Sequence, residues 1–119
     1  MHVECAWRIA QEERVLAGSV DVYYPADLRI EEPLPGDAWD KGPNRLEVLM
    51  RALFEEGKRE FIVRRVDVGA AGALSIVMDG GLSLDVLPQN SLSDEYWRLF
   101  RPHTDDKHFV VTGRGIEEP

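Results

Sequence analysis

Alternating hydrophobic and polar residues predict a strand pair at the start of the chain. Val3, Cys5, Trp7 and Ile9 alternate with less hydrophobic neighbours, which is the period of a half-buried strand. After the polar break Gln11-Glu12-Glu13-Arg14, a second set of apolar positions shares one face of a strand over residues 16–24. Because the break is short, we expect the two strands to form an antiparallel hairpin.

A helical period replaces the alternation in the middle of the chain. Asn44 followed by Glu47 resembles a helix start. The apolar positions after it recur at i, i+3, i+4, i+7 and i+8, and they are Leu46, Leu49, Met50, Leu53 and Phe54. With Gly57 suited to the helix end, we expect one amphipathic helix at about 44–57, with Leu49, Leu53 and Phe54 buried.

The remainder of the chain reads mainly as strands. Alternation predicts strands over 61–68, 74–78, 82–86 and 109–112, with a tight turn at Asp79-Gly80-Gly81 between the second and third. We expect a helical turn within 92–97, a short strand at 97–101, and a frayed tail from Gly113 to Pro119. The predicted fold is a single α+β domain over 1–119. Its mainly antiparallel six- or seven-stranded sheet would carry the helix on one face.

Composition narrows the class of protein. The chain has 119 residues, of which 44% are hydrophobic, and this suits a chain that buries its own core. No apolar run approaches the length of a membrane span, and the first eight residues lack the basic start and apolar run of a signal peptide. The single cysteine excludes an internal disulfide. We therefore expect a cytoplasmic protein with no membrane contact.

The acidic charge gathers in one irregular segment. The net charge is −8, and residues 21–40 carry six acidic side chains against Arg29 alone. Four prolines within 25–44 exclude a regular strand or a long helix, so residues 21–44 form what we call the acidic loop. Trp39 lies there between Asp37 and Asp40, outside any periodic pattern. This composition argues against nucleic-acid binding and favours a basic protein partner. The expected contacts are Trp39, Asp37, Asp40, Glu31 and Glu32.

Other reactive side chains form no pattern typical of a catalytic or metal site. Cys5 lies on an apolar strand face, where a thiol is inert. The side chains of His103, Asp105, Asp106 and His108 are of types that bind zinc, but their spacing fits no closed zinc site, and His2 is too near the terminus to be predicted as a further ligand. Asp94 and Glu95 are adjacent, and Glu95 is three residues from Arg98. We expect no catalytic residue, no metal and no cofactor.

A repeated Trp-Arg pair offers an alternative binding face. Neighbouring residues of a strand point to opposite sides, so the two tryptophans can be buried while Arg8 and Arg98 point outward. Two such arginines could line one face of the sheet and recognise carboxylates.

Four segments carry a resemblance to known proteins. They are Cys5-Ala6-Trp7-Arg8-Ile9, Leu16-Ala17-Gly18-Ser19-Val20-Asp21, Gly81-Leu82-Ser83-Leu84-Asp85-Val86-Leu87-Pro88 and Glu95-Tyr96-Trp97-Arg98-Leu99. In these the chain resembles small uncharacterised bacterial α+β proteins, some of which are immunity proteins of polymorphic toxins. The resemblance implies the fold and a toxin-neutralising role, and it implies no site residue.

Three functions follow as hypotheses. The first is an immunity protein that neutralises a basic toxin domain through the acidic surface. The second is a structural module that self-associates through a sheet edge or face, as a homo-oligomer. The third is a small ligand-binding domain or enzyme that uses the polar sheet face.

Overall fold

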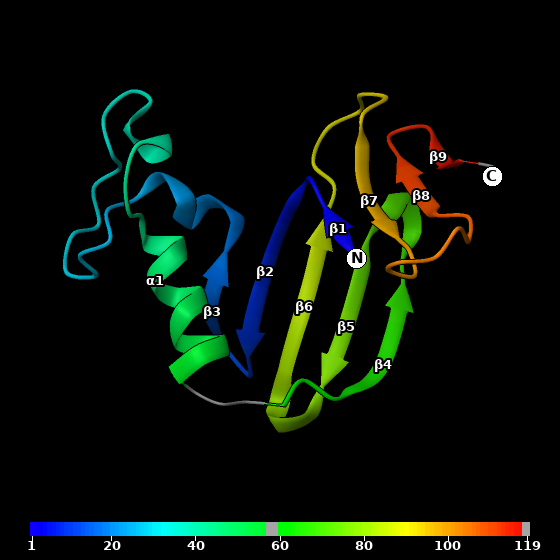
Figure 1. Cartoon of the computed structure of the whole chain (residues 1–119), viewed down its shortest axis with the longest axis horizontal. Coiled ribbons are helices and arrows are strands. Elements are labelled where there is room, and N and C mark those ends of the chain that lie inside the picture. The colour runs from blue at the N-terminus through cyan, green and yellow to red at the C-terminus, as the bar shows by residue number, and fades with distance from the viewer. Residues whose placement is uncertain (57–59, 118–119) are drawn as a thin grey trace.

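The residues that the structure describes form two antiparallel sheets and one short α-helix (Figure 1). The computed structural model describes residues 1–56 and 60–117. The larger sheet has the strand order β3-β2-β6-β5-β4. Its strands are β2 (Ala6–Gln11), β3 (Arg14–Gly18), β4 (Val63–Val68), β5 (Leu74–Met78) and β6 (Leu82–Leu87). The smaller sheet has the order β1-β7-β8-β9, with β1 (His2–Val3), β7 (Glu95–Leu99), β8 (Phe109–Thr112) and β9 (Gly115–Glu117).

The α+β class and the antiparallel pairing are confirmed, whereas the expected single sheet is wrong. The division occurs within the first predicted strand, at Glu4 and Cys5. Val3 pairs with Trp97 of the smaller sheet, and the N–H of Glu4 donates to the carbonyl of Tyr96 at 2.8 Å. Trp7 instead pairs with Val86 of the larger sheet. Alternation continues through the break, so the period alone does not reveal the change of partner.

The two predicted hairpins are present. Gln11 pairs with Arg14 across the β2–β3 turn, where Glu12 has a φ of 54°. Between β5 and β6, Gly80 and Gly81 have φ values of 78° and 76°. Glycine adopts positive φ without steric cost, which explains the Asp79-Gly80-Gly81 turn (η5).

The second predicted strand is shorter than expected because its polar residues bind the backbone. β3 ends at Gly18, and the 3₁₀ helix η1 (Ser19–Tyr23) follows. The Asp21 carboxylate accepts the N–H of Gly18 at 2.8 Å, and Ser19 Oγ accepts the N–H of Trp7 at 3.1 Å. These bonds offer the backbone an alternative to a sheet ladder.

The predicted helix begins as expected and then changes its pitch. The Asn44 side chain accepts the N–H of Glu47 at 3.1 Å and caps α1 (Arg45–Arg51). A π-helical turn, η3 (Ala52–Glu56), continues it. Leu53 is buried at 7% exposure and Leu49 is partly buried, but Phe54 is 50% exposed, so its predicted burial is wrong. Because a π turn has more residues than an α turn, Phe54 no longer follows the stripe. The predicted end at Gly57 lies outside the described residues.

The region after β6 also differs from the prediction. Residues 95–99 form β7 in place of the expected helical turn within 92–97. The segment Gly115–Glu117 forms β9 against β8, although a frayed tail was expected. The last two residues of that expected tail, 118–119, lie outside the described part of the chain.

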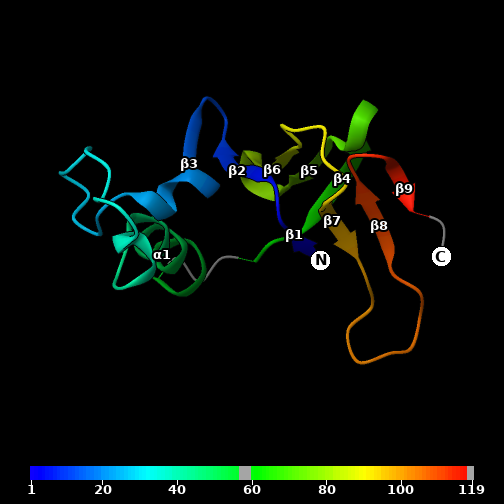
Figure 2. The same ribbon diagram turned by 90° about the horizontal axis from the view of Figure 1, so that it is seen from above.

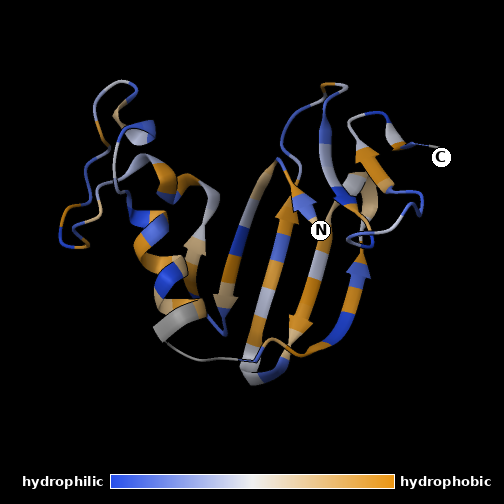
Figure 3. Ribbon diagram, in the orientation of Figure 1, coloured by the Kyte–Doolittle hydropathy of each residue, from blue (hydrophilic) through white to orange (hydrophobic). Residues whose placement is uncertain are grey.

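The helix and the smaller sheet cover the same face of the larger sheet at its two ends (Figure 2). Leu82 and Val86 project from the same side of β6. Leu82 belongs to a core cluster with Ile9, Ala17 and Leu53 from the helical turn. Val86 belongs to a second cluster with Leu74, Tyr96, Trp97 and Val111. In Figure 3, hydrophobic residues in orange alternate with more polar ones along the central strands.

Candidate functional site

The acidic loop is closed at its base by backbone contacts. Pro25 forms a β-bridge with Asn44, and the N–H of Arg45 donates to the carbonyl of Tyr24 at 2.8 Å. Inside the loop, the N–H of Leu34 donates to the carbonyl of Tyr23 at 2.8 Å. The Asn44 amide reaches the carbonyl of Trp39 at 3.5 Å while its oxygen caps the helix. The loop is thus joined to α1 and extends from it at one end of the molecule (Figure 1).

Trp39 lies on the outside of this loop. It belongs to the short 3₁₀ helix η2 (Ala38–Asp40), and 37% of its surface is exposed. Its ring meets Tyr23 edge to face, with centroids 5.6 Å apart and an interplanar angle of 72°. Tyr23 is itself 46% exposed. The pair therefore presents an aromatic surface to solvent. The edge-to-face contact is a favourable arrangement of two aromatic rings and holds each ring in place.

The acidic side chains of the loop divide into paired and unpaired groups. Three of them have a basic neighbour: Asp21 lies 3.6 Å from Arg45, Asp27 lies 2.8 Å from Arg29, and Asp37 lies 3.2 Å from Lys41. The hydrogen bonds from Arg29 lower the pKa of Asp27. Among the described residues, no basic side chain forms an ion pair with the other three.

Those three are Glu31, Glu32 and Asp40, and all are exposed. Glu31 lines a shallow hollow of about 300 Å³ together with Asp21, Tyr24 and Arg45. The structure therefore keeps all five predicted contact residues on the exposed acidic loop. Glu31, Glu32 and Asp40 have no basic ion-pair partner in the described part of the chain, whereas Asp37 is partly neutralised by Lys41.

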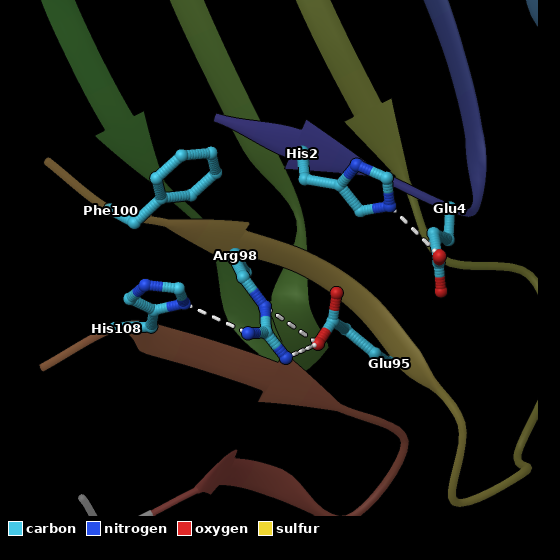
Figure 4. Close-up of a pocket in the computed structure, with 6 residues that line it drawn as sticks. All are labelled: His2, Glu4, Glu95, Arg98, Phe100 and His108. Atoms are coloured by element: carbon cyan, nitrogen blue, oxygen red, sulfur yellow. Dashed lines mark hydrogen bonds and ion pairs between the residues drawn. The ribbon is translucent and has the colours of Figure 1, made fainter. Parts of the chain in front are cut away.

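A second group of polar side chains lines a hollow of the smaller sheet (Figure 4). His2 Nε2 lies 2.8 Å from Glu4 Oε1, and Arg98 Nε donates to Glu95 Oε1 at 3.0 Å. Arg98 Nη1 lies 2.8 Å from His108 Nδ1. Since a guanidinium only donates, Nδ1 of His108 is the acceptor in this contact. The hydrogen bonds with Glu95 raise the pKa of Arg98.

A β-bulge in β7 brings Glu95 and Arg98 together. Glu95 pairs with Thr112 and Trp97 with Val111, so Tyr96 is an extra residue in the ladder. Tyr96 and Trp97 are consequently both buried, and across the bulge Glu95 and Arg98, three residues apart, point to the same side. The contact between Glu95 and Arg98 that the sequence suggested is confirmed, although it forms on a bulged strand.

The ligating atoms of His2, Glu4 and Glu95 lie within 4.8 Å of one another. A cation there would compete with the Arg98 guanidinium for Glu95, so the group is an ion-pair network as it stands. The possible metal ligands between residues 103 and 108 do not face one another as a group. Asp106 pairs with Arg101 at 3.3 Å, and His108 faces Arg98 rather than His103 or Asp105.

Arg8 and Arg98 lie in different sheets. Arg8 Nε donates to Asp85 Oδ2 at 3.0 Å, and Ser75 Oγ donates to Asp85 Oδ1 at 3.0 Å. These side chains form a row across β2, β6 and β5 on the outer face of the larger sheet. Each arginine thus already has a carboxylate partner and lines a separate hollow.

The sequence did not reveal Tyr23 as the partner of Trp39, because the alternation over 16–24 places Tyr23 in an extended strand. The signal that could have shown it is Asp21, three residues after Gly18, which is the spacing of a side chain that caps a turn.

No family model, curated protein or solved structure matches the chain. In the part of the chain that the structure describes, no helix is long and apolar enough to cross a membrane.

Proposed function

We propose that this chain is a cytoplasmic protein-binding module that recognises a basic protein through the acidic loop. The observation that carries the proposal is the exposed Trp39–Tyr23 pair, on a loop where three carboxylates have no ion-pair partner among the described residues. Aromatic residues at the centre of an interface contribute much of the binding free energy. Carboxylates around them attract a basic partner and accelerate its association.

The closed base of the loop supports the same role. The bonds at Tyr24, Asn44 and Arg45 restrict the loop before a partner arrives. A restricted loop loses less conformational entropy on binding than a free one. Four prolines restrict the backbone further.

Within this class, we propose an immunity protein that covers the active site of a basic toxin domain. The basis is the resemblance to immunity proteins and the acidic surface that would face such a domain. The role is one of occlusion, so it assigns no catalytic residue and no cofactor to this chain. Nucleic acid would be repelled by the same carboxylates.

Trp39→Ala should separate binding from folding. We expect this change to weaken the partner complex about 30-fold, or about 2 kcal/mol, because the aromatic anchor is lost. The partner is first captured from the native host on the wild-type chain and identified by mass spectrometry. Its affinity is then measured by calorimetry. Phe54→Ala is a matched control, since Phe54 is an exposed aromatic residue outside the loop.

Charge variants test whether the carboxylates of the acidic loop accelerate association with a basic partner. Asp40→Asn should slow association more than Asp37→Asn, because Lys41 already offsets Asp37, and both effects should fade in high salt.

Co-expression tests the immunity role: the captured partner should inhibit growth, and the wild-type chain should restore growth better than Trp39→Ala. Unchanged affinity in Trp39→Ala and Asp40→Asn would place the interface elsewhere. A partner that does not inhibit growth would rule out immunity.

A further inference from the structure

β4 is an open edge of the larger sheet. It is the last strand in the order β3-β2-β6-β5-β4, and all six of its residues are exposed (Figure 1). An edge strand offers a row of backbone N–H and C=O groups to another strand. β4 contains no proline that would interrupt such a row.

The pairing with β5 determines which backbone groups point outward. Val68 lies opposite Leu74, and one step further the N–H of Gly69 donates to the carbonyl of Ala73 at 2.9 Å. Residues of an antiparallel pair alternate between bonding their partner and facing away. Asp67 and Arg65 therefore direct their backbone groups to β5, and Val66 and Val68 direct theirs to solvent.

We propose that β4 pairs with β4 of a second copy of this chain, antiparallel and about a two-fold axis through Val66. Each Val66 then donates its N–H to the carbonyl of the partner's Val66. Arg65 lies opposite the partner's Asp67, and Asp67 opposite the partner's Arg65. The two five-stranded sheets become one continuous sheet. This inference is independent of the acidic loop, which lies at the other end of the molecule (Figure 1).

Charge complementarity selects this register and a second copy as the occupant. Arg65 Nε donates to Asp67 Oδ2 at 2.7 Å, so the two side chains lie on one face of β4. In the proposed register they form a square of alternating charges with those of the second copy. Centring the pair on Asp67 or on Arg65 would instead set two like charges opposite each other, which is unfavourable.

The apolar side of β4 supports the same pairing. Val66 and Val68 are 53% and 65% exposed, although they share the face on which β5 and β6 bury Leu74 and Val86. In the proposed dimer the Val66 side chains of the two copies are neighbours across the two-fold axis. Their contact removes apolar surface from water, which stabilises the pair.

The molar mass of the full chain in solution, measured by sedimentation over a range of concentrations, tests the proposal. We expect a concentration-dependent dimer. Arg65→Asp and Asp67→Arg should each weaken dimerisation at least about tenfold, because each sets like charges opposite one another at two sites. Mixing the two variants in equal amounts should restore the dimer, since one β4 is then wholly acidic and the other wholly basic at these positions.

Each charge variant also loses the Arg65–Asp67 pair within its own chain, and mixing the variants does not restore that pair. A dimer that returns on mixing therefore shows that the two residues contact the other copy. Arg29→Asp is the matched control, because Arg29 and Asp27 form an exposed pair of the same spacing far from β4 in sequence. It should leave the dimer unchanged, as should Trp39→Ala. Should the two charge variants fail to fold, Val66→Lys serves in their place, because Val66 is 53% exposed, and it should give a monomer.

A wild-type chain that stays monomeric at millimolar concentration would overturn the proposal. So would a wild-type dimer that Val66→Lys leaves intact, or mixed charge variants that associate no better than either alone. The calorimetric test of Trp39 is unaffected by these outcomes, so failure of the dimer and failure of the proposed function can be told apart.

Discussion

Single polar side chains determine where the secondary structure of this protein changes. Asp21 and Ser19 bind backbone N–H groups of Gly18 and Trp7, and β3 ends there. Asn44 caps α1 with its oxygen and holds the carbonyl of Trp39 with its nitrogen. The start of the helix and the position of Trp39 therefore depend on one buried amide.

Cys5 should react slowly with alkylating reagents. Its side chain is half-buried, against the expected full burial, and desolvation raises the pKa of the thiol. A raised pKa leaves less thiolate at neutral pH, so the rate should be below that of a free thiol and should rise only at higher pH. Iodoacetamide labelling of the native chain against pH, with the urea-unfolded chain as the control, measures both. Labelling as fast in the native chain as in urea would contradict the expectation.

The helix and β7 each depart from regular geometry, and both departures change which side chains are buried. The π turn of η3 separates Leu53 from Phe54, although both belong to the apolar stripe. The bulge in β7 buries the adjacent residues Tyr96 and Trp97 and brings Glu95 to Arg98. Neither irregularity has a periodic signature, because each inserts one residue into an otherwise normal pattern.

Leu53 and Phe54 should therefore differ in their contribution to stability. Leu53→Ala should lower the free energy of unfolding by about 2–5 kcal/mol, through lost transfer free energy and the cavity that remains. Phe54→Ala should cost less, because half of the Phe54 surface stays in water, although its ring lies against that of Phe61 with the centroids 4.8 Å apart. Urea unfolding of both variants gives the comparison. Equal losses would mean that the stripe is buried as a whole.

At the level of the molecule, the contact between the two sheets depends on Trp97 and Gly72. The Trp97 indole N–H donates to the carbonyl of Gly72 at 2.8 Å. Gly72 belongs to η4 (Ala70–Gly72), which connects β4 and β5 of the larger sheet. This bond and the core cluster around Val86 join the smaller sheet to the larger one.

Gly72→Ala should disturb this contact more than the same change in a free turn. Gly72 has a φ of 83°, and an added methyl group would lie 3.0 Å from Val111 Cγ1. Gly80 has a similar φ of 78° but nothing within 4 Å, which makes Gly80→Ala a matched control. We expect Gly80→Ala to cost about 1–2 kcal/mol through backbone strain, and Gly72→Ala about 1–3 kcal/mol more through overpacking. Thermal and urea unfolding of both variants measure the difference. Similar losses in the two variants would show that the contact between the sheets accommodates the added methyl group with no loss of stability.

The sequence by itself determined the features that depend on neighbouring residues. The two hairpins, the turn at Gly80 and Gly81, the cap at Asn44 and the irregular acidic loop were all predicted from short stretches of chain. Each is local, because the residues that specify it are within a few positions of one another.

Tertiary structure alone decided the arrangement of these pieces. The pattern from Val3 to Ile9 is continuous, yet Val3 joins one sheet and Trp7 the other. The exposure of β4 also depends on its place at the end of the strand order. Period-two alternation specifies which face of a strand is apolar, but long-range backbone hydrogen bonds and packing select its neighbours.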